Sequence, residues 1–418
     1  MYAIRVSLST LLGVAIMMTL TGLAWGATRP ADDAGPAGPV CIKPPQPVDP
    51  LTAYRFDSPA GPIAAQTDAD GKLWCWGQAV KQGEGMVFKP SPWPKDNPSA
   101  GVTVTQVKEG LIEVKIDGQP FTEFHWGEDE IKPYLWPVIG PTGSPVTRAY
   151  PMKEVEGERI DHIHHRSIWA AWGDVRTSDL SKPGTNYWAQ AKNPNDQDRQ
   201  IVRKIVRTAS GPVFGQIVAD IDWVSRTGQG EFSEVRTYTF YRGDDDNRLI
   251  DVRNVFAFDD GDVMFADTKE AGVLSLRIAT SMDEITLDRK PGKGRITNSR
   301  GETGGGDKPG NCWGRPADWC DYTGPVEGKT IGIAVFDKPG NPGHPPRWHI
   351  RDYGLFAVNN YGLKDFPDGK GKNGSHLFKK GEHQVFDYRI VIHKGDAQAA
   401  RVADQYKLYA DNPTAKIK

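Results

Sequence analysis

The chain has 418 residues, with 51 lysines and arginines against 53 aspartates and glutamates, so its formal net charge is −2 at pH 7. This balance provides no basic footprint for nucleic acid or for an anionic membrane surface as a partner. The length is sufficient to bury one large core, with room for an appendage.

Residues 1–26 have the features of a cleaved secretory signal peptide. An early cation, Arg5, precedes an apolar run that begins at Leu11, and the small residues Ala24 and Gly26 fit a cleavage site. The alternative is a membrane anchor, but the run is shorter than the ~20 residues that a span needs. We therefore expect a periplasmic or secreted protein that does not contact the membrane in its mature form.

Composition divides the rest of the chain into three parts. Residues 27–50 are rich in proline and alanine, which predicts an extended linker. Residues 51–100 are expected to form an N-terminal appendage. Residues 101–418 are expected to form the main domain.

The four cysteines are an even number, and in an oxidising compartment this favours disulfides. Cys312 and Cys320 flank a short loop, so we expect them to pair and leave Cys41 to pair with Cys75. A zinc site is the weaker alternative, because the sequence has no CxxC pair.

Short runs of alternating, β-branched and aromatic residues follow, separated by turn residues, which predicts antiparallel strands. These runs are residues 102–107, 111–118, 213–224, 233–258, 272–279, 330–337 and 383–396. No repeat of fixed period is visible, which favours a large all-β sandwich over a propeller. Only residues 396–411 have a helical pattern, in which Ala400, Val402, Tyr406 and Leu408 can share a face.

The segment DHIHHRSIWAAWGD, residues 161–174, concentrates chemically active side chains. If it is extended from residue 162 to 168, His162, His164 and Arg166 share one face, and His165 points to the other. Two imidazoles beside a guanidinium suit a carboxylate or an oxyanion better than a metal ion. The alternative is a set of hydrogen-bonded polar groups that only stabilises a loop.

Two distant segments add candidate acid–base groups. Asp267, Lys269 and Glu270 precede a predicted strand, while His349 and Arg351 share one face of another. Glu270 together with His349 or His164 would supply a general base and acid. The alternative for the first segment is a solvated turn.

Tryptophans accompany these segments, and an aromatic face can stack on a sugar ring, although large aromatic residues more often belong to the core. Trp169 or Trp172 is expected to offer such a surface. The tryptophans concerned are Trp126, Trp136, Trp169, Trp172, Trp188, Trp313, Trp319 and Trp348.

Several segments, in this order, resemble a bacterial family of unestablished activity that is often labelled "methane oxygenase PmoA". They are KPYLWPVIGPTGSPVTRAYP, DHIHHRSIWAAWGDV, DTKEAGVLSLRIA, ITNSRGE, WGRPADWCDYTG and HPPRWHIRDYGLFAVNNYG. A true particulate methane monooxygenase subunit spans the membrane repeatedly, and this chain has no segment for that after residue 26. The resemblance implies instead a β-rich protein associated with carbohydrate catabolism, with a galactose-mutarotase-like supersandwich fold.

We therefore expect a carbohydrate-active enzyme, a hydrolase, lyase or sugar epimerase, that acts on an acidic or oxidised sugar. The expected catalytic residues are His164, Glu270 and His349, and no metal or cofactor is expected. The expected binding residues are His162, His165, Arg166, Trp169, Trp172, Asp174, Arg148, Asp267, Lys269 and Arg351. The alternatives are a noncatalytic sugar-binding or structural protein and a copper or iron redox protein with His162, His164 and His349 as ligands.

Overall fold

A computed structural model describes residues 38–44, 47–58, 61–77, 87–88, 100–306, 308–411 and 414–416. The predicted signal peptide, residues 1–26, lies outside this described part. None of the helices that the structure describes has the length and apolar character needed to cross a membrane.

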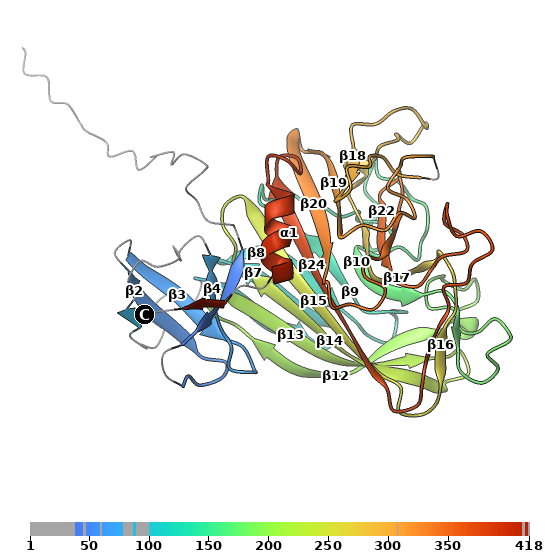
Figure 1. Ribbon diagram of the computed structural model, residues 1–418, viewed down its shortest axis with the longest axis horizontal. Coiled ribbons are helices and arrows are strands. Elements are labelled where there is room, and N and C mark those ends of the chain that lie inside the picture. Colours follow the sequence, from blue (N-terminus) through green and yellow to red (C-terminus); the bar gives the residue numbers. More distant parts are fainter. Residues whose placement is uncertain are drawn as a thin grey trace, which may run out of the picture. The chain divides into compact units, whose positions relative to one another are not determined.

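The predicted all-β architecture is confirmed, because two eight-stranded antiparallel sheets make up most of the fold (Figure 1). The first sheet, named the front sheet, has the order β21-β22-β17-β10-β9-β8-β7-β6, and the second, named the back sheet, has the order β12-β13-β14-β15-β24-β20-β19-β18. In the view of Figure 1 the back sheet is the one nearer to the reader. The front strands are β6 (Val102–Lys108), β7 (Leu111–Ile116), β8 (Gln119–His125), β9 (Tyr134–Val138), β10 (Ile168–Trp172), β17 (Ala271–Arg277), β21 (Arg347–Ile350) and β22 (Leu355–Asn359). The back strands are β12 (Arg199–Ala209), β13 (Phe214–Val224), β14 (Gly230–Tyr241), β15 (Asn247–Ala257), β18 (Arg295–Asn298), β19 (Trp319–Val326), β20 (Lys329–Asp337) and β24 (His383–Lys394).

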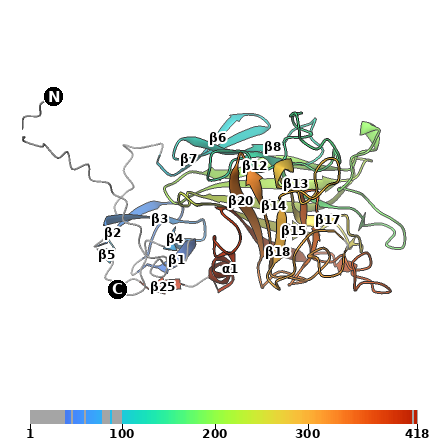
Figure 2. The ribbon, with the colours of Figure 1, turned by 90° about the horizontal axis from the view of Figure 1, so that it is seen from above.

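The period-two alternation of strands gives the front sheet a core face and an outer face. Ile168, Leu276, Phe356 and Ile350 stand opposite one another on neighbouring strands and belong to one core with back-sheet residues such as Ile221. Figure 2 shows β6, β7 and β8 lying along the back-sheet strands β12 and β13. The residue next to each core residue therefore points to the outer face.

Two smaller sheets complete the fold. One consists of β11 (Val175–Arg176), β16 (Val263–Phe265) and β23 (His376–Phe378). The other, the small sheet, consists of β1 (Pro39–Lys43), β2 (Ala53–Ser58), β3 (Gly61–Thr67), β4 (Leu73–Trp76), β5 (Val87–Phe88) and β25 (Thr414–Lys416). Strand β1 falls inside the interval predicted to be a linker, and its Val40 and Ile42 are buried in a small core.

The helix predicted near the C-terminus is present as α1 (Val402–Asp411). It begins later than residue 396 for two reasons. The Asp396 carboxylate accepts hydrogen bonds from the amides of Gln398 and Ala399, which forms a turn, and Arg401 has a left-handed φ of 53°. The buried side chains of Val402 and Leu408 hold the helix on the fold. Two 3-10 turns, η2 (Pro194–Asp196) and η3 (Thr280–Met282), lie in the connections.

The cysteines are free thiols in this structure, contrary to the expected disulfides. Cys41 stands opposite Trp74 and Cys75 stands opposite Val40, so the two thiols point to opposite faces of the small sheet. Cys312 and Cys320 are neighbours that interact as thiols, and the sulfur of Cys312 donates a hydrogen bond to the carbonyl of Glu302 at 3.2 Å.

Candidate functional site

One row of residues across the outer face of the front sheet forms the floor of the candidate site. His349, Ala357, Ser275 and Trp169 stand opposite one another on β21, β22, β17 and β10. The two middle side chains are small. A ring from elsewhere can therefore lie between His349 and Trp169.

Trp188, from the loop after β11, supplies that ring. Its ring centroid lies 6.1 Å from that of His349 and 5.9 Å from that of Trp169. Trp313 approaches His349 from another loop, with 6.5 Å between the ring centroids. Aromatic rings from distant parts of the chain therefore enclose the imidazole of His349.

The histidine segment is a turn, so the expectation of an extended strand from 162 to 168 is wrong. His162 has a left-handed φ of 46°, and the amide of His165 donates to the carbonyl of His162 at 2.9 Å. As a result the rings of His162, His164 and His165 contact one another, with centroid distances of 4.5 to 5.8 Å. The side chains do not alternate between two faces.

Arg148 is the residue that holds this turn. It is completely buried, and its guanidinium donates to the carbonyls of Asp161 (2.8 Å), His162 (3.2 Å) and His165 (3.2 Å). Its donors are used on backbone oxygens and on the Asp161 carboxylate, so it shapes the backbone beneath the site. We expected Arg148 to bind the ligand directly.

His165 is the most deeply buried of the three histidines, at 1% exposure. Its Nδ1 accepts a hydrogen bond from Arg277 at 3.0 Å, so a neutral ring carries its proton on Nε2. Burial first, and then the charge of Arg277, hold the pKa of His165 well below its usual value. Its Nε2–H therefore points into the cluster as a donor, with no hydrogen-bond acceptor among the described residues.

Two further candidate histidines, His164 and His349, are also neutral at pH 7. Burial, followed by the charges of Lys132 and His162, lowers the pKa of His164 to about 3. Burial and the charge of Arg351 lower the pKa of His349 to about 3. The backbone of Lys269 hydrogen-bonds the His349 ring, and Nδ1 is left with no partner among the described residues.

Two arginines lie close to the ring of Tyr353. The guanidinium carbons of Arg277 and Arg351 lie 4.9 and 5.6 Å from its centroid. Arg277 is paired with Asp161 at 2.7 Å, whereas Arg351 has no carboxylate partner within the described part of the chain. Arg351 also lies 5.6 Å from the centroid of Trp313, so its cation is held between two aromatic rings.

Glu270 lies at the edge of this cluster. Its side chain is 42% exposed and lies 3.3 Å from the ammonium of Lys269. After burial, its charge is among the factors that raise the pKa of Tyr353, which places it near that residue. The backbone of Lys269 also contacts His349. The segment 269–270 therefore places the Glu270 carboxylate in the same region as the His349 imidazole.

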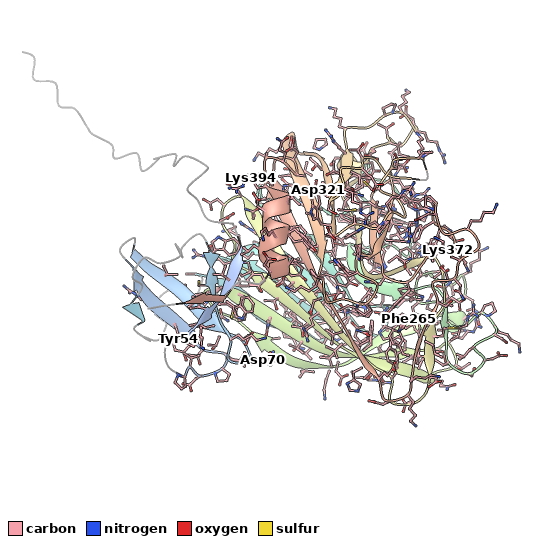
Figure 3. All side chains as sticks on the ribbon, in the orientation of Figure 1. Tyr54, Asp70, Phe265, Asp321, Lys372 and Lys394 are labelled. Atoms are coloured by element: carbon pink, nitrogen blue, oxygen red, sulfur yellow. The ribbon has the colours of Figure 1, made fainter. Side chains whose placement is uncertain are left out.

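Four of the expected binding residues are committed elsewhere. Trp172 lies in the core, where it stacks on Phe265, labelled in Figure 3, with 4.9 Å between centroids. Asp267 accepts hydrogen bonds from the amides of residues 363, 364 and 374. Asp174 pairs with Arg176 at 2.7 Å, and Arg166 lies 3.5 Å from Glu130.

The sequence reasoning did not assign roles to several residues of the cluster. Arg277 lies two residues from Ser275 on β17, and Tyr353 lies two residues from Arg351 in the turn after β21, so nearness in sequence to Arg351 was the available signal for Tyr353. Trp188 and Trp313 lie in loops, where no local pattern indicates which way a side chain folds back. Within the described ranges, no set of three histidine, cysteine, aspartate or glutamate side chains is placed to hold a metal ion.

A family model described as "Family of unknown function (DUF6807)" matches residues 111–407. No curated protein sequence matches this chain. Among solved structures, it is similar to the GalM/aldose epimerase homologue from C. elegans, at 8% identity and a TM-score of 0.32, over 71% of this chain and 100% of that one. It is also similar to the GH36 alpha-galactosidase AgaA from Geobacillus stearothermophilus, at 12% identity and a TM-score of 0.23, over 82% of this chain and 40% of that one.

Proposed function

Because this chain belongs to the DUF6807 family of unknown function, we propose its activity from the site itself. The cluster around His164, His165 and His349 binds an acidic or oxidised sugar and acts on it by acid–base chemistry. The reaction class is hydrolysis, elimination or epimerisation.

The observation that carries this proposal is a set of buried polar atoms that have no hydrogen-bond partner among the described residues, on side chains that contact one another. They are His165 Nε2, Trp169 Nε1, Trp188 Nε1, His349 Nδ1, Trp313 Nε1 and Arg351 Nε. Leaving such an atom unpaired costs about 1 to 3 kcal/mol, so buried polar groups in native proteins are nearly always paired. A polar ligand that enters the cluster would satisfy several of them at once.

The hydrogen-bonding character of these atoms suits hydroxyl groups. The indole nitrogens and His165 Nε2 are donors, whereas Nδ1 of a neutral His349 that is protonated on Nε2 is an acceptor. A sugar hydroxyl both donates and accepts hydrogen bonds. The CH surface of the sugar ring would pack on the rings of Trp169 and Trp188.

Arg351 supports an anionic group on that sugar. Its guanidinium has no carboxylate partner among the described residues and lies against the rings of Trp313 and Tyr353. A guanidinium binds a carboxylate through two parallel hydrogen bonds. A bound carboxylate would also raise the pKa of His349, which the charge of Arg351 now lowers.

The proposed proton transfers use three residues. Glu270, exposed at the edge, acts as the base. His349, with a free Nδ1, accepts or returns a proton inside the cluster, and the partly exposed His164 exchanges protons with solvent.

The test is turnover of a panel of uronates, aldonates and their glycosides, followed by proton NMR. His164→Ala and Glu270→Ala should abolish turnover and leave the melting temperature within a few degrees of the wild-type value, because both side chains are partly exposed. Arg351→Leu should raise KM for the acidic substrate at least about 10- to 100-fold, because the variant loses both charge-assisted hydrogen bonds to the carboxylate.

Arg347→Leu is the matched control. Arg347 begins β21, the strand that Arg351 directly follows, and its charge is paired with Asp368 at 2.7 Å. It should leave KM unchanged. If no compound on the panel reacts and His164→Ala strongly destabilises the fold, the cluster is structural and the proposal fails.

A noncatalytic sugar-binding protein is the second candidate. The low pKa values of His164 and His349 favour it, because an imidazole with a pKa near 3 is a weak base at pH 7. Saturable binding of an acidic sugar without turnover, lost in Arg351→Leu, would select this alternative.

The proposal places the protein in the periplasm or outside the cell. The signal pattern of residues 1–26 supports this location. The mass of the exported protein should match a chain that begins after residue 26.

A further inference from the structure

A cavity of about 490 Å³ lies on the outer face of the back sheet, away from the histidine cluster. The strands β13, β14, β15 and β24 form its floor, and α1 and the turn between β3 and β4 form its walls. Its volume falls in the range of small-molecule sites, which often occur where two structural units meet. We propose that this cavity is a second ligand site, which binds a neutral saccharide.

The floor is polar because two rows of outward-pointing side chains cross the sheet. Gln216, Thr239, Asp251 and Arg389 stand opposite one another on four adjacent strands. A parallel row consists of Thr237, Arg253 and Asp387. Neighbouring amide, hydroxyl, carboxylate and guanidinium groups are the set that hydrogen-bonds adjacent sugar hydroxyls.

The walls are aromatic, and hydrogen bonds fix their orientation. The indole nitrogen of Trp74 donates to Asp68 at 2.8 Å, and Asp68 also accepts from the amides of residues 70 and 72. Asp70, labelled in Figure 3, marks this turn. Opposite it, Tyr241 donates to Asp251 at 3.0 Å, and Arg389 lies 4.8 Å from the ring centroid of Tyr409. A locked aromatic wall binds a sugar ring at a low cost in side-chain entropy.

Charge pairing inside the cavity points to an uncharged ligand. Arg389 donates to Asp251 at 2.6 and 2.7 Å, and Arg253 pairs with Asp387 at 2.9 Å. Neither pair leaves a net charge for an ionic ligand to neutralise. The complete lining nearly balances as well, because the carboxylates of Asp68 and Asp70 stand against the cations of Lys72, Arg207 and Lys338. Two buried donors in the lining, Arg207 Nε and the Tyr409 hydroxyl, have no partner among the described residues, and hydroxyl oxygens would satisfy them.

The wall that carries Trp74 lies outside the family model, which begins at residue 111. The family domain contains the floor of the cavity, and the small sheet adds its aromatic side. This gives the N-terminal appendage a role in binding that is independent of the histidine cluster.

The test is isothermal titration calorimetry of the full chain with maltose, cellobiose, lactose and sucrose. At least one of these should bind saturably. Trp74→Ala should weaken that binding about tenfold or more, because the variant loses both the stacked aromatic ring and the apolar area that the ring buries. Thr237→Val, which keeps the side-chain shape on the other side of the cavity, should also weaken it while the melting temperature stays at the wild-type value.

Trp76→Ala is the matched control, because Trp76 follows two residues later on β4 and does not line the cavity. It should bind like the wild type, and so should Arg351→Leu, which alters only the histidine cluster. Binding by none of the four sugars overturns this proposal and leaves the first site untouched. Equal losses in the two tryptophan variants, or a loss in Arg351→Leu, also overturn it.

Discussion

At the scale of single residues, the candidate site is a group of imidazoles that the fold keeps uncharged. His349 is buried, and Arg351, the cation that lowers its pKa most, is not neutralised by a carboxylate in the described part of the chain. The fold therefore bears the cost of holding a neutral imidazole beside a positive charge. Binding of an anion would relieve that cost.

This arrangement predicts acid sensitivity. The unfolded chain binds a proton at His349 below pH ~6.5, whereas the folded protein does so only near pH 3, so stability falls as the pH drops between these values. We expect His349 to account for about 3 kcal/mol of lost unfolding free energy between pH 7 and pH 4. Urea unfolding at several pH values should show a smaller loss in His349→Gln.

The control for this measurement is His383→Gln, because the His383 side chain is 57% exposed. It should lose stability with falling pH as the wild type does. An unchanged pH dependence in His349→Gln would show that the imidazole is not held neutral by the fold.

At the scale of elements, a buried guanidinium replaces secondary structure in the histidine segment. Arg148 collects carbonyl oxygens of residues 159, 161, 162 and 165 that a strand would have paired with a neighbour. Its charge is balanced by Asp161. Burial opposes ionisation of that carboxylate, but the hydrogen bond from His162 and the charge of Arg277 outweigh burial and lower its pKa.

Arg148→Met should therefore destabilise the protein by about 3 to 5 kcal/mol, because it leaves several carbonyl oxygens without their donor and removes one of the two guanidiniums paired with the half-buried Asp161. Denaturant unfolding measures the loss. Arg253→Met is the control, since Arg253 is 52% exposed in its pair with Asp387 and should cost less than about 1 kcal/mol. Similar losses in the two variants would contradict the role given to Arg148.

At the scale of the whole domain, the two large sheets approach each other most closely where β6 meets β13. A Cβ atom on Gly215 would lie 2.7 Å from methyl carbons of both Val102 and Val104. Such a distance is shorter than a normal carbon contact. Only glycine lets the strands lie this close without displacing a packed side chain.

Gly215→Ala should cost about 1 to 3 kcal/mol through overpacking. Gly230, at the start of β14, has open space at its Cβ position, so Gly230→Ala should be neutral or stabilise by up to about 1 kcal/mol. Thermal unfolding of the pair checks the prediction. A neutral Gly215→Ala would mean that the sheets can separate at this edge without cost.

The sequence alone determined those features that depend on local periodicity. Alternating residues predicted the antiparallel sheets and the strand that carries His349, although β21 ends at Ile350, one residue before Arg351. The helical pattern around Val402 and Leu408 predicted α1. These predictions succeed because the secondary structure of a short segment depends largely on the spacing of its own apolar side chains.

Only the tertiary structure decided the contacts that close the candidate site. The turn at His162 requires Arg148, whose backbone partners extend to residue 165, and the rings around His349 come from loops at Trp188 and Trp313. The thiols of Cys41 and Cys75 were separated by strand register, which the spacing of the cysteines does not encode. In each case the determining interaction joins residues far apart in the chain, and its energy depends on burial and on distances that only the complete fold establishes.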